Sequence, residues 1–308
     1  MTAPVRLRRS IETLGRVAPL GVRFRDAITG TDIVDLTVDA WPAVVDPAVE
    51  QTLRRVRAFV TAGGVYGWTD LPGLRHHTFG AGDDAYWRTL EPPLPLLYRV
   101  EVMDEAGRFL PFRFTVRAPA RGVVTWTVDP TGSPPNASGA VPLYSAPSRL
   151  PPAATAVIRA ELHEAEPRRP AAWAVVEARI GGRRIGRGMA DEKGRLLLLA
   201  HYPEPAPPPL GVGAASPPGA SRVPLWNQEW PVELDVYYGA RPTGAVTDPP
   251  DLSEALLQPA ALVWLDDRRR MALATVSLKY GEELRVRTRG EDARGALLVT
   301  RTDGGSPP

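Results

Sequence analysis

The chain has 308 residues, of which 44% are hydrophobic and 23% are charged, a composition that is typical of a folded protein and too apolar for a disordered one. Its 37 Lys and Arg residues are nearly balanced by 35 Asp and Glu residues, so the net charge is only +2. It contains no cysteine, which excludes disulfides and thiolate nucleophiles and suits a reducing compartment. The 34 prolines and 28 glycines favour many short strands over long helices.

The sequence offers no segment that predicts export or membrane insertion. Glu12 interrupts the region where a signal peptide needs an apolar core. No run approaches the roughly 20 apolar residues of a membrane-spanning helix. We therefore expect no membrane span and a cytoplasmic location.

The first part of the chain predicts a basic arm at residues 1–20 followed by a β-sandwich at 21–128. Two alternating apolar runs flank the turn DAITGTD within 21–41, and a second, clearer hairpin is predicted at 98–119. Residues 46–60 allow one or two helical turns. The run GVVTWTV at 122–128 predicts one further strand.

A stretch rich in Pro, Ser and Gly at 129–152 shows no periodicity and predicts a linker. Strand patterns then resume, which places a second sandwich at 153–247 with a further proline-rich bridge at 204–224. Residues 248–308 begin with DLSEALLQ, which combines a helix cap with helical apolar spacing, and continue with several apolar runs. These runs either complete the second sandwich or form a small extra unit.

The order of strands and turns in the first half returns in the second half. This recurrence predicts two related β-sandwiches joined by proline-rich linkers, with little helix. The expected fold class is therefore all-β.

The stretch EARIGGRRIGRGMADEKGRLLLLAHYP at 177–203 is the first candidate for a binding site. Gly186 and Gly188 match the start of a dinucleotide fingerprint, but Asp191 replaces its third glycine and no helix is predicted to follow. The arginines at 183, 184 and 187 are interpreted as solvent-facing strand positions, and the acidic residues around them argue against nucleic-acid binding. The turn at 191–194 and the leucines at 196–199 predict a hairpin leading into a buried strand.

Other candidate sites are weaker. His76, His77, Asp83 and Asp84 are residue types that bind metals, but an exposed polar loop is the preferred interpretation. Ser138 lacks the context of a hydrolase nucleophile. We therefore expect no catalytic residue, no cofactor and no metal.

Aromatic and basic side chains supply the candidate contacts with partners. They are Arg6, Arg8 and Arg9 in the arm, and Trp226, Trp230, Tyr237 and Tyr238 in the second half. Trp and Tyr are enriched in protein interfaces and half-buried strands. The alternative is a platform on which sugar rings stack.

Two resemblances follow from these motifs. The first is to carboxypeptidase regulatory-like domains, which are transthyretin-like β-sandwiches. It is carried by the run AVVEA at 174–178, the neighbouring glycines and ADEKGRLLLLAHYP at 190–203.

The second resemblance is to accessory proteins of phage-tail-like contractile injection systems. It is carried by FRDAITGTDIVDLTVDAWP, GRFLPFRFTVRAP and the residues from 141 to 180. That resemblance implies a non-enzymatic structural component, near the baseplate or another tube end, whose partners are other subunits of the particle. The particle would assemble in the cytoplasm and leave by lysis. The alternative function is a carbohydrate- or surface-binding module.

Overall fold

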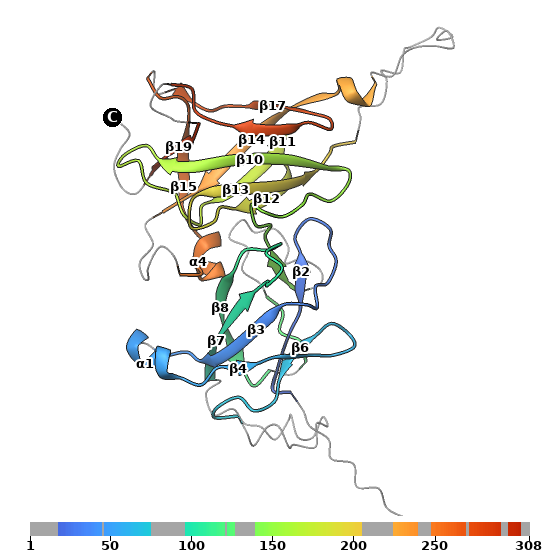
Figure 1. Cartoon of the computed structure of the whole chain (residues 1–308), viewed down its shortest axis with the longest axis vertical. Helices are drawn as coiled ribbons and strands as arrows, with labels where there is room; N and C mark the ends of the chain where they lie inside the picture. The colour runs from blue at the N-terminus through green and yellow to red at the C-terminus, as the bar shows by residue number, and fades with distance from the viewer. Residues whose placement is uncertain are drawn as a thin grey trace, which may run out of the picture.

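The computed structural model shows an all-β protein with two short helices in its described part, which confirms the predicted fold class (Figure 1). Two β units are stacked along the long axis of the molecule. None of the helices in the described ranges has the length and apolarity that crossing a membrane requires. The described residues are 18–44, 46–74, 96–120, 122–126, 139–204, 224–239, 248–268, 271–290 and 295–302.

The N-terminal unit contains nine strands and one helix within these ranges. They are β1 (Leu20–Val22), β2 (Phe24–Asp26), β3 (Thr37–Pro42), α1 (Pro47–Thr52), β4 (Val56–Arg57), β5 (Phe59–Val60), β6 (Tyr66–Trp68), β7 (Leu96–Met103), β8 (Phe112–Ala118) and β9 (Val141–Leu143).

The C-terminal unit contains the remaining strands, one short helix and a 3-10 turn. They are β10 (Thr155–Glu164), β11 (Val175–Ile180), β12 (Arg183–Met189), β13 (Arg195–His201), η1 (Leu225–Asn227), β14 (Glu229–Tyr237), α4 (Leu252–Leu256), β15 (Ala260–Asp266), β16 (Met271–Ala272), β17 (Val276–Lys279), β18 (Glu283–Val286) and β19 (Leu297–Arg301).

The N-terminal unit is a two-layered sandwich. One layer is the antiparallel sheet β4-β3-β7-β8, and the other combines the sheet β1-β6-β5 with the parallel pair β2-β9. Alternate residues of β8 point into the core, so Phe112 and Phe114 meet Phe24 from the opposite layer, at ring-centroid distances of 6.4 and 6.2 Å. The predicted hairpin at 98–119 is confirmed as β7 and β8.

The predicted hairpin at 21–41 is wrong. Strand β2 pairs with β9 and strand β3 pairs with β7, so the two predicted partners lie in different layers. The DAITGTD turn itself is closed by backbone hydrogen bonds and by an isolated antiparallel bridge between Arg25 and Asp32, but β2 and β3 do not pair beyond it. Apolar alternation predicts each strand but not its partner, because the pattern records which face is buried and not which neighbour supplies the hydrogen bonds.

The predicted linker at 129–152 is folded over its described part, 139–152. Strand β9 pairs with β2, and Tyr144 and Ser145 just after it are buried. Pro142 lies within β9, which is compatible with pairing because β9 is an edge strand and its outer side needs no donor. In residues 122–126, where a strand was expected, the structure has a single bridge from Val123 to Gly21.

The C-terminal unit is built on one curled sheet of ten strands, whose main path is β12-β11-β14-β15-β19-β10-β13. Strands β15 and β17 pair with β14, while β18 and β19 pair with β10. The strands from 261 to 300 therefore complete the second unit, which decides between the two predicted alternatives. The two units have different strand orders, so the predicted repetition of one sandwich is not found in the described residues.

Strand β12 packs closely against β13, and glycine makes this approach possible. A Cβ atom at Gly186 would lie 2.6 Å from the backbone oxygen of Leu199. The turn between the two strands is closed by Asp191, whose Oδ1 accepts hydrogen bonds from the backbone N–H of Lys193 and Arg195 at 2.9 and 2.8 Å. The predicted turn is thus confirmed, and so is the burial of the four leucines at 196–199.

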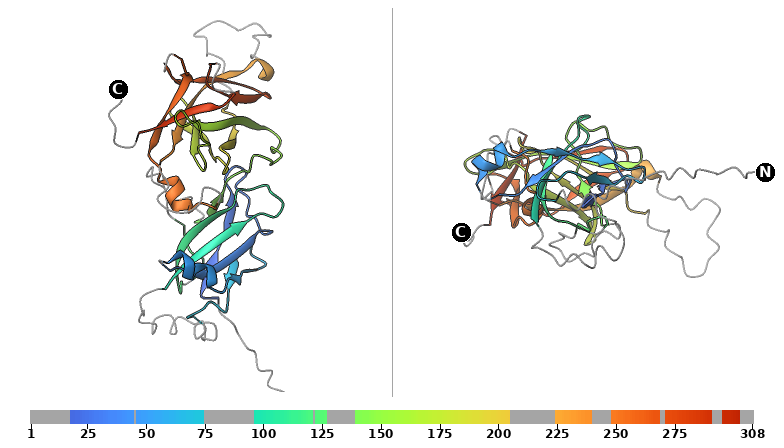
Figure 2. Two further views of the ribbon diagram at one scale, coloured as in Figure 1. Left: turned by 60° about the vertical axis from the view of Figure 1, so that its left-hand side comes forward. Right: turned by 90° about the horizontal axis from the view of Figure 1, so that it is seen from below.

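Each unit has its own hydrophobic core, and the core of the N-terminal unit extends across the junction to include residues of the C-terminal unit. Helix α4, capped by Asp251 as the sequence predicts, lies between the units and places Leu252 and Leu256 in the core of the N-terminal unit (Figure 2). Trp173 of the C-terminal unit is buried in the same cluster. The edge of β8 is met there by the chain just before α4, where the Arg113 N–H donates to the Pro250 oxygen at 2.7 Å. The junction is therefore closed by buried apolar side chains and by a backbone hydrogen bond.

Candidate functional site

The residues predicted to contact partners are placed very differently from one another. Trp226 lies on η1 and is 75% exposed, Trp230 is half-buried at the start of β14, and Tyr237 packs partly against the core of the N-terminal unit. Tyr238 is only 5% exposed, and its hydroxyl donates a hydrogen bond to the buried carboxylate of Glu164. The prediction for Tyr238 is therefore wrong, because this side chain has no surface to offer.

Arg6, Arg8 and Arg9 lie outside the described residues, as do Ser138 and the histidines and aspartates at 76, 77, 83 and 84. The expectation that residues 76, 77, 83 and 84 form an exposed polar loop and not a metal site therefore stays a prediction.

An aromatic corner gathers at the end of the C-terminal unit where β14 pairs with β17. It consists of Tyr202, Trp230 and Tyr280, with Tyr202 at ring-centroid distances of 5.6 Å from Trp230 and 4.7 Å from Tyr280. The Tyr202 hydroxyl accepts a hydrogen bond from the Gly281 N–H at 2.9 Å. Sequence reasoning missed Tyr202 and Tyr280 because strand pairing alone brings these distant residues together.

The junction between the units contains a buried ionic cluster. Glu177 on β11 is 0% exposed and accepts hydrogen bonds from Arg179 at 2.6 Å, Arg184 at 3.1 Å and Arg187 at 2.7 Å. The side chain of Arg187 is 13% exposed and also hydrogen-bonds Tyr144 of the N-terminal unit. The interpretation of Arg187 as solvent-facing is therefore wrong, because its strand face is covered by the other unit.

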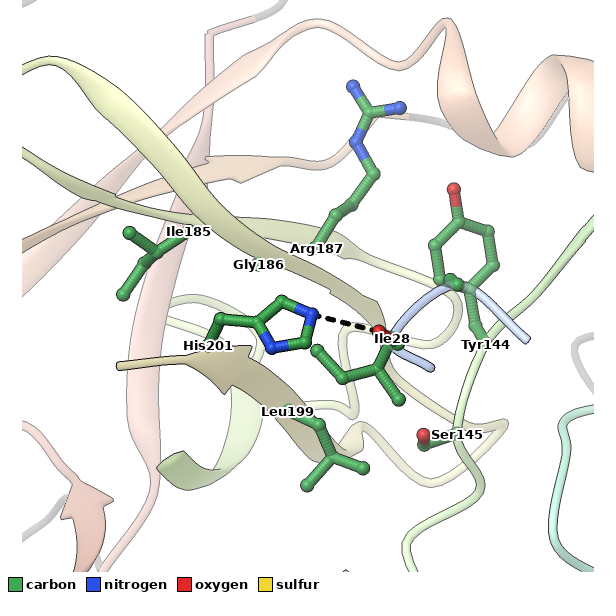
Figure 3. Close-up of a pocket in the computed structure, with 9 residues that line it drawn as sticks. Ile28, Tyr144, Ser145, Ile185, Gly186, Arg187, Leu199 and His201 are labelled. Atoms are coloured by element: carbon green, nitrogen blue, oxygen red, sulfur yellow. Dashed lines mark hydrogen bonds between the residues drawn. The ribbon is translucent and has the colours of Figure 1, made fainter. Parts of the chain in front are cut away.

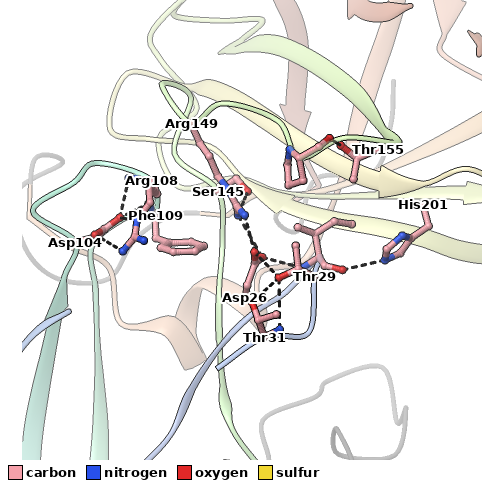
Figure 4. Close-up of polar contacts among 12 residues, drawn as sticks. Asp26, Thr29, Thr31, Asp104, Arg108, Phe109, Ser145, Arg149, Thr155 and His201 are labelled. Atoms are coloured by element: carbon pink, nitrogen blue, oxygen red, sulfur yellow. Dashed lines mark hydrogen bonds and ion pairs between the residues drawn. The ribbon is translucent and has the colours of Figure 1, made fainter. Parts of the chain in front are cut away.

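A second ionic cluster lies on the N-terminal side of the junction (Figure 4). The buried carboxylate of Asp26 accepts hydrogen bonds from Arg149 at 2.5 Å and from the Thr29 hydroxyl at 2.8 Å. The Arg149 guanidinium also stacks over the ring of Phe109, 4.7 Å from its centroid. Through Arg149, the segment that leads from β9 to β10 is tied to the turn after β2.

These carboxylates are held in their charged form. Burial alone would raise the pKa of Glu177, but the attraction and hydrogen bonds of Arg187 and Arg184 outweigh it, so the pKa lies below its ordinary value. Burial also opposes ionisation of Asp26, and the hydrogen bond from Arg149 again brings the net pKa below normal. A general base needs a pKa near the working pH, so such carboxylates are poor proton acceptors.

A small cavity lies between these clusters (Figure 3). Ile28 and Tyr144 line it from the N-terminal unit, and Arg187, Leu199 and His201 from the C-terminal unit. The His201 Nε2 lies 2.9 Å from the Ile28 oxygen and closes one side. With a volume of ≈ 60 Å³ it has room for a few water molecules, whereas ligand pockets usually measure about 300 Å³ or more. The cavity is therefore a small gap inside the junction, with residues of both units around it.

Within the described ranges, no group of three or more His, Asp or Glu side chains is arranged to hold a metal ion. The buried carboxylates described above are all engaged by arginine. What this arrangement can do is to fix two β units in one orientation.

No family model matches the chain, and no curated protein matches it. Among solved structures, a crystal structure of a mutant of the shaft pilin SpaA from Lactobacillus rhamnosus GG aligns with 7% sequence identity, over 94% of this chain and 98% of that chain. The TM-score is 0.23, which is too low to support an argument about fold or function. The function has to be inferred from the chain's own residues.

Proposed function

We propose that the protein is a non-enzymatic structural component of a contractile injection particle, placed near the baseplate or another tube end, which acts through protein–protein contacts. The observation that carries this proposal is the junction. Trp173 and helix α4 pack into the core of the N-terminal unit, and together with the Glu177 cluster they fix the two β units as one elongated body. Such a body can hold two neighbouring subunits at a set distance, while its buried charged groups are arranged for cohesion and not for proton transfer.

The outer edge of the N-terminal unit offers a contact surface. Strand β5 is an edge strand, and both of its residues, Phe59 and Val60, are exposed. Apolar side chains on an unprotected edge strand invite pairing with another chain. We expect this edge to be covered by a neighbouring subunit.

The test is co-sedimentation of the protein with particles in the cells that make it. The wild-type protein is expected in the fast-sedimenting fraction together with sheath and tube subunits. The variant Val60→Lys is expected to leave that fraction, because a lysine on an edge strand opposes strand pairing. Met271→Lys is the matched control, since Met271 is similarly exposed on the other unit. A wild-type protein that never sediments with a particle would contradict the proposal.

A second candidate function, carbohydrate binding, is favoured by the aromatic corner and the exposed Trp226. Sugar rings stack on exposed aromatic faces. Tyr202 contacts Trp230, and the exposed Trp226 lies on η1, shortly before Trp230 in the chain. If the protein remains a monomer, a glycan array should then give a signal that Trp226→Ala removes. A flat array would dismiss this alternative.

A further inference from the structure

A groove of ≈ 950 Å³ opens on the C-terminal unit, beside the segment that joins the two units. This is the size of a pocket that takes a substantial ligand. Its polar lining consists chiefly of arginine and glutamate from three strands and their ends. These residues, which we call the arginine groove, are Arg159, Glu161, Arg195, Glu283, Arg285 and Arg287.

Strand register places these side chains on one face of the sheet. β18 runs parallel to β10 with Arg285 opposite Arg159, and β13 runs antiparallel to β10 with Arg195 opposite Glu161. Residues two apart on a strand share a face, so Glu161 joins Arg159, and Arg287 joins Arg285. The sequence does not predict this grouping, because β18 is far from β10 along the chain.

The ion pairs within the groove leave positive charge unsatisfied. Arg159 and Arg285 would repel each other, but Glu283 bridges them, accepting from Arg159 Nε at 3.0 Å and from Arg285 Nε at 2.7 Å. Both oxygens of Glu283 are thereby used. Within the described part of the chain, the terminal nitrogens of Arg285 make no hydrogen bond and Arg287 has no ion-pair partner. The Arg285 side chain is 81% exposed.

We propose that the arginine groove binds an acidic segment of a neighbouring protein chain, whose Asp or Glu carboxylates pair with Arg285 and Arg287. A guanidinium offers a planar fork of donors that matches a carboxylate. None of the described residues lining the groove is aromatic, so the bases of a single-stranded nucleic acid would have no ring to stack on. The inference rests on the proposed function for the source of the segment.

The test measures binding of fluorescein-labelled octaglutamate by fluorescence anisotropy. We expect wild-type protein to bind the peptide, with an affinity that falls as salt is added. Charge reversal in Arg285→Glu/Arg287→Glu should weaken binding by at least about tenfold, because the peptide then faces two carboxylates. The control Arg54→Glu/Arg183→Glu makes the same change in net charge at exposed residues outside the groove, and it should bind like wild type.

Three outcomes would overturn the inference. They are an absence of octaglutamate binding by the wild type, an equal loss in both double variants, and equally tight binding of labelled oligothymidylate that depends on the same arginines. The assay needs no particle, so its failure leaves the co-sedimentation result standing. If the protein binds octaglutamate but never sediments with a particle, the binding role of the arginine groove stands and the proposed place in a particle is contradicted.

Discussion

Glu177 illustrates how this protein keeps a charge inside its structure. Removing a carboxylate from water is costly, and the cost is offset only when close donors satisfy its oxygens. Three arginines do so here, and one of them also contacts Tyr144 in the other unit. In the sequence, Glu177 resembles any polar residue of a strand, but in the structure it is part of the junction.

Replacing this carboxylate should destabilise the protein at neutral pH. In Glu177→Gln the nearly buried Arg187 loses its counter-charge. We expect the free energy of unfolding to fall by roughly 3 kcal/mol. The folded state holds the pKa of Glu177 below 4.5, so its stabilising effect is complete above pH 4.5 and is lost as the pH falls through the folded-state pKa. The gap between variant and wild type should therefore narrow in acid. Urea unfolding at several pH values measures it.

The matched control is Glu229→Gln. Glu229 lies on β14 of the same sheet and pairs with Lys279 at 3.4 Å, but both side chains are about half exposed. Surface pairs contribute little, so this variant should unfold almost like wild type. Equal losses in the two variants would show that burial of Glu177 is not what makes it important.

At the scale of elements, the turn from β12 to β13 depends on Gly194. Its φ of +77° lies in the left-handed region, and a Cβ there would come within 2.2 Å of the Leu162 oxygen. The D-x-x-G signal in the sequence predicts the turn. Only the folded structure shows that the backbone of β10 lies directly against Gly194.

We expect Gly194→Ala to destabilise the protein by roughly 3 kcal/mol or more, because backbone strain and a clash with main-chain atoms act together. Gly281→Ala is the control. Its φ of +75° is nearly the same, but nothing lies within 4 Å of the added Cβ, so only the strain of about 1 kcal/mol remains. Thermal unfolding followed by circular dichroism compares the two. Similar melting temperatures would rule out the contribution of the clash.

Elements with local signals were the ones that could be predicted. The hairpin at 98–119 and helix α4 carry their own turn or cap, and both are confirmed. The pairing of β2 with β9 could not be predicted, since its partners are separated by more than a hundred residues and β9 contains Pro142. The arginine groove escaped prediction for the same reason, because its strands come together from different parts of the chain.

For the whole molecule, the buried apolar contact at the junction should make the two units unfold together. Cooperative unfolding follows when the contact between units is as well packed as the units themselves. Far-UV circular dichroism and tryptophan fluorescence should therefore report one coincident transition. Leu252→Ala, which empties part of that contact, should cost about 2–5 kcal/mol and separate the two signals.

Leu257→Ala serves as the control for this variant. Leu257 ends the same helix but is 58% exposed, so its truncation should leave the transition nearly unchanged. Two separate transitions in the wild type would contradict the rigid junction on which the proposed structural role depends.

The sequence by itself determined the all-β class, the short strands, the turn at 191–194 and the buried leucine strand, because each depends on the properties of neighbouring residues. Tertiary structure alone decided which strands pair, that 139–152 belongs to a folded unit, that Arg187 is covered and that Tyr238 is buried. It also brought together the aromatic corner and the arginine groove. These features depend on contacts between residues far apart in the chain, and a periodic pattern carries no record of which distant segment will cover a given face.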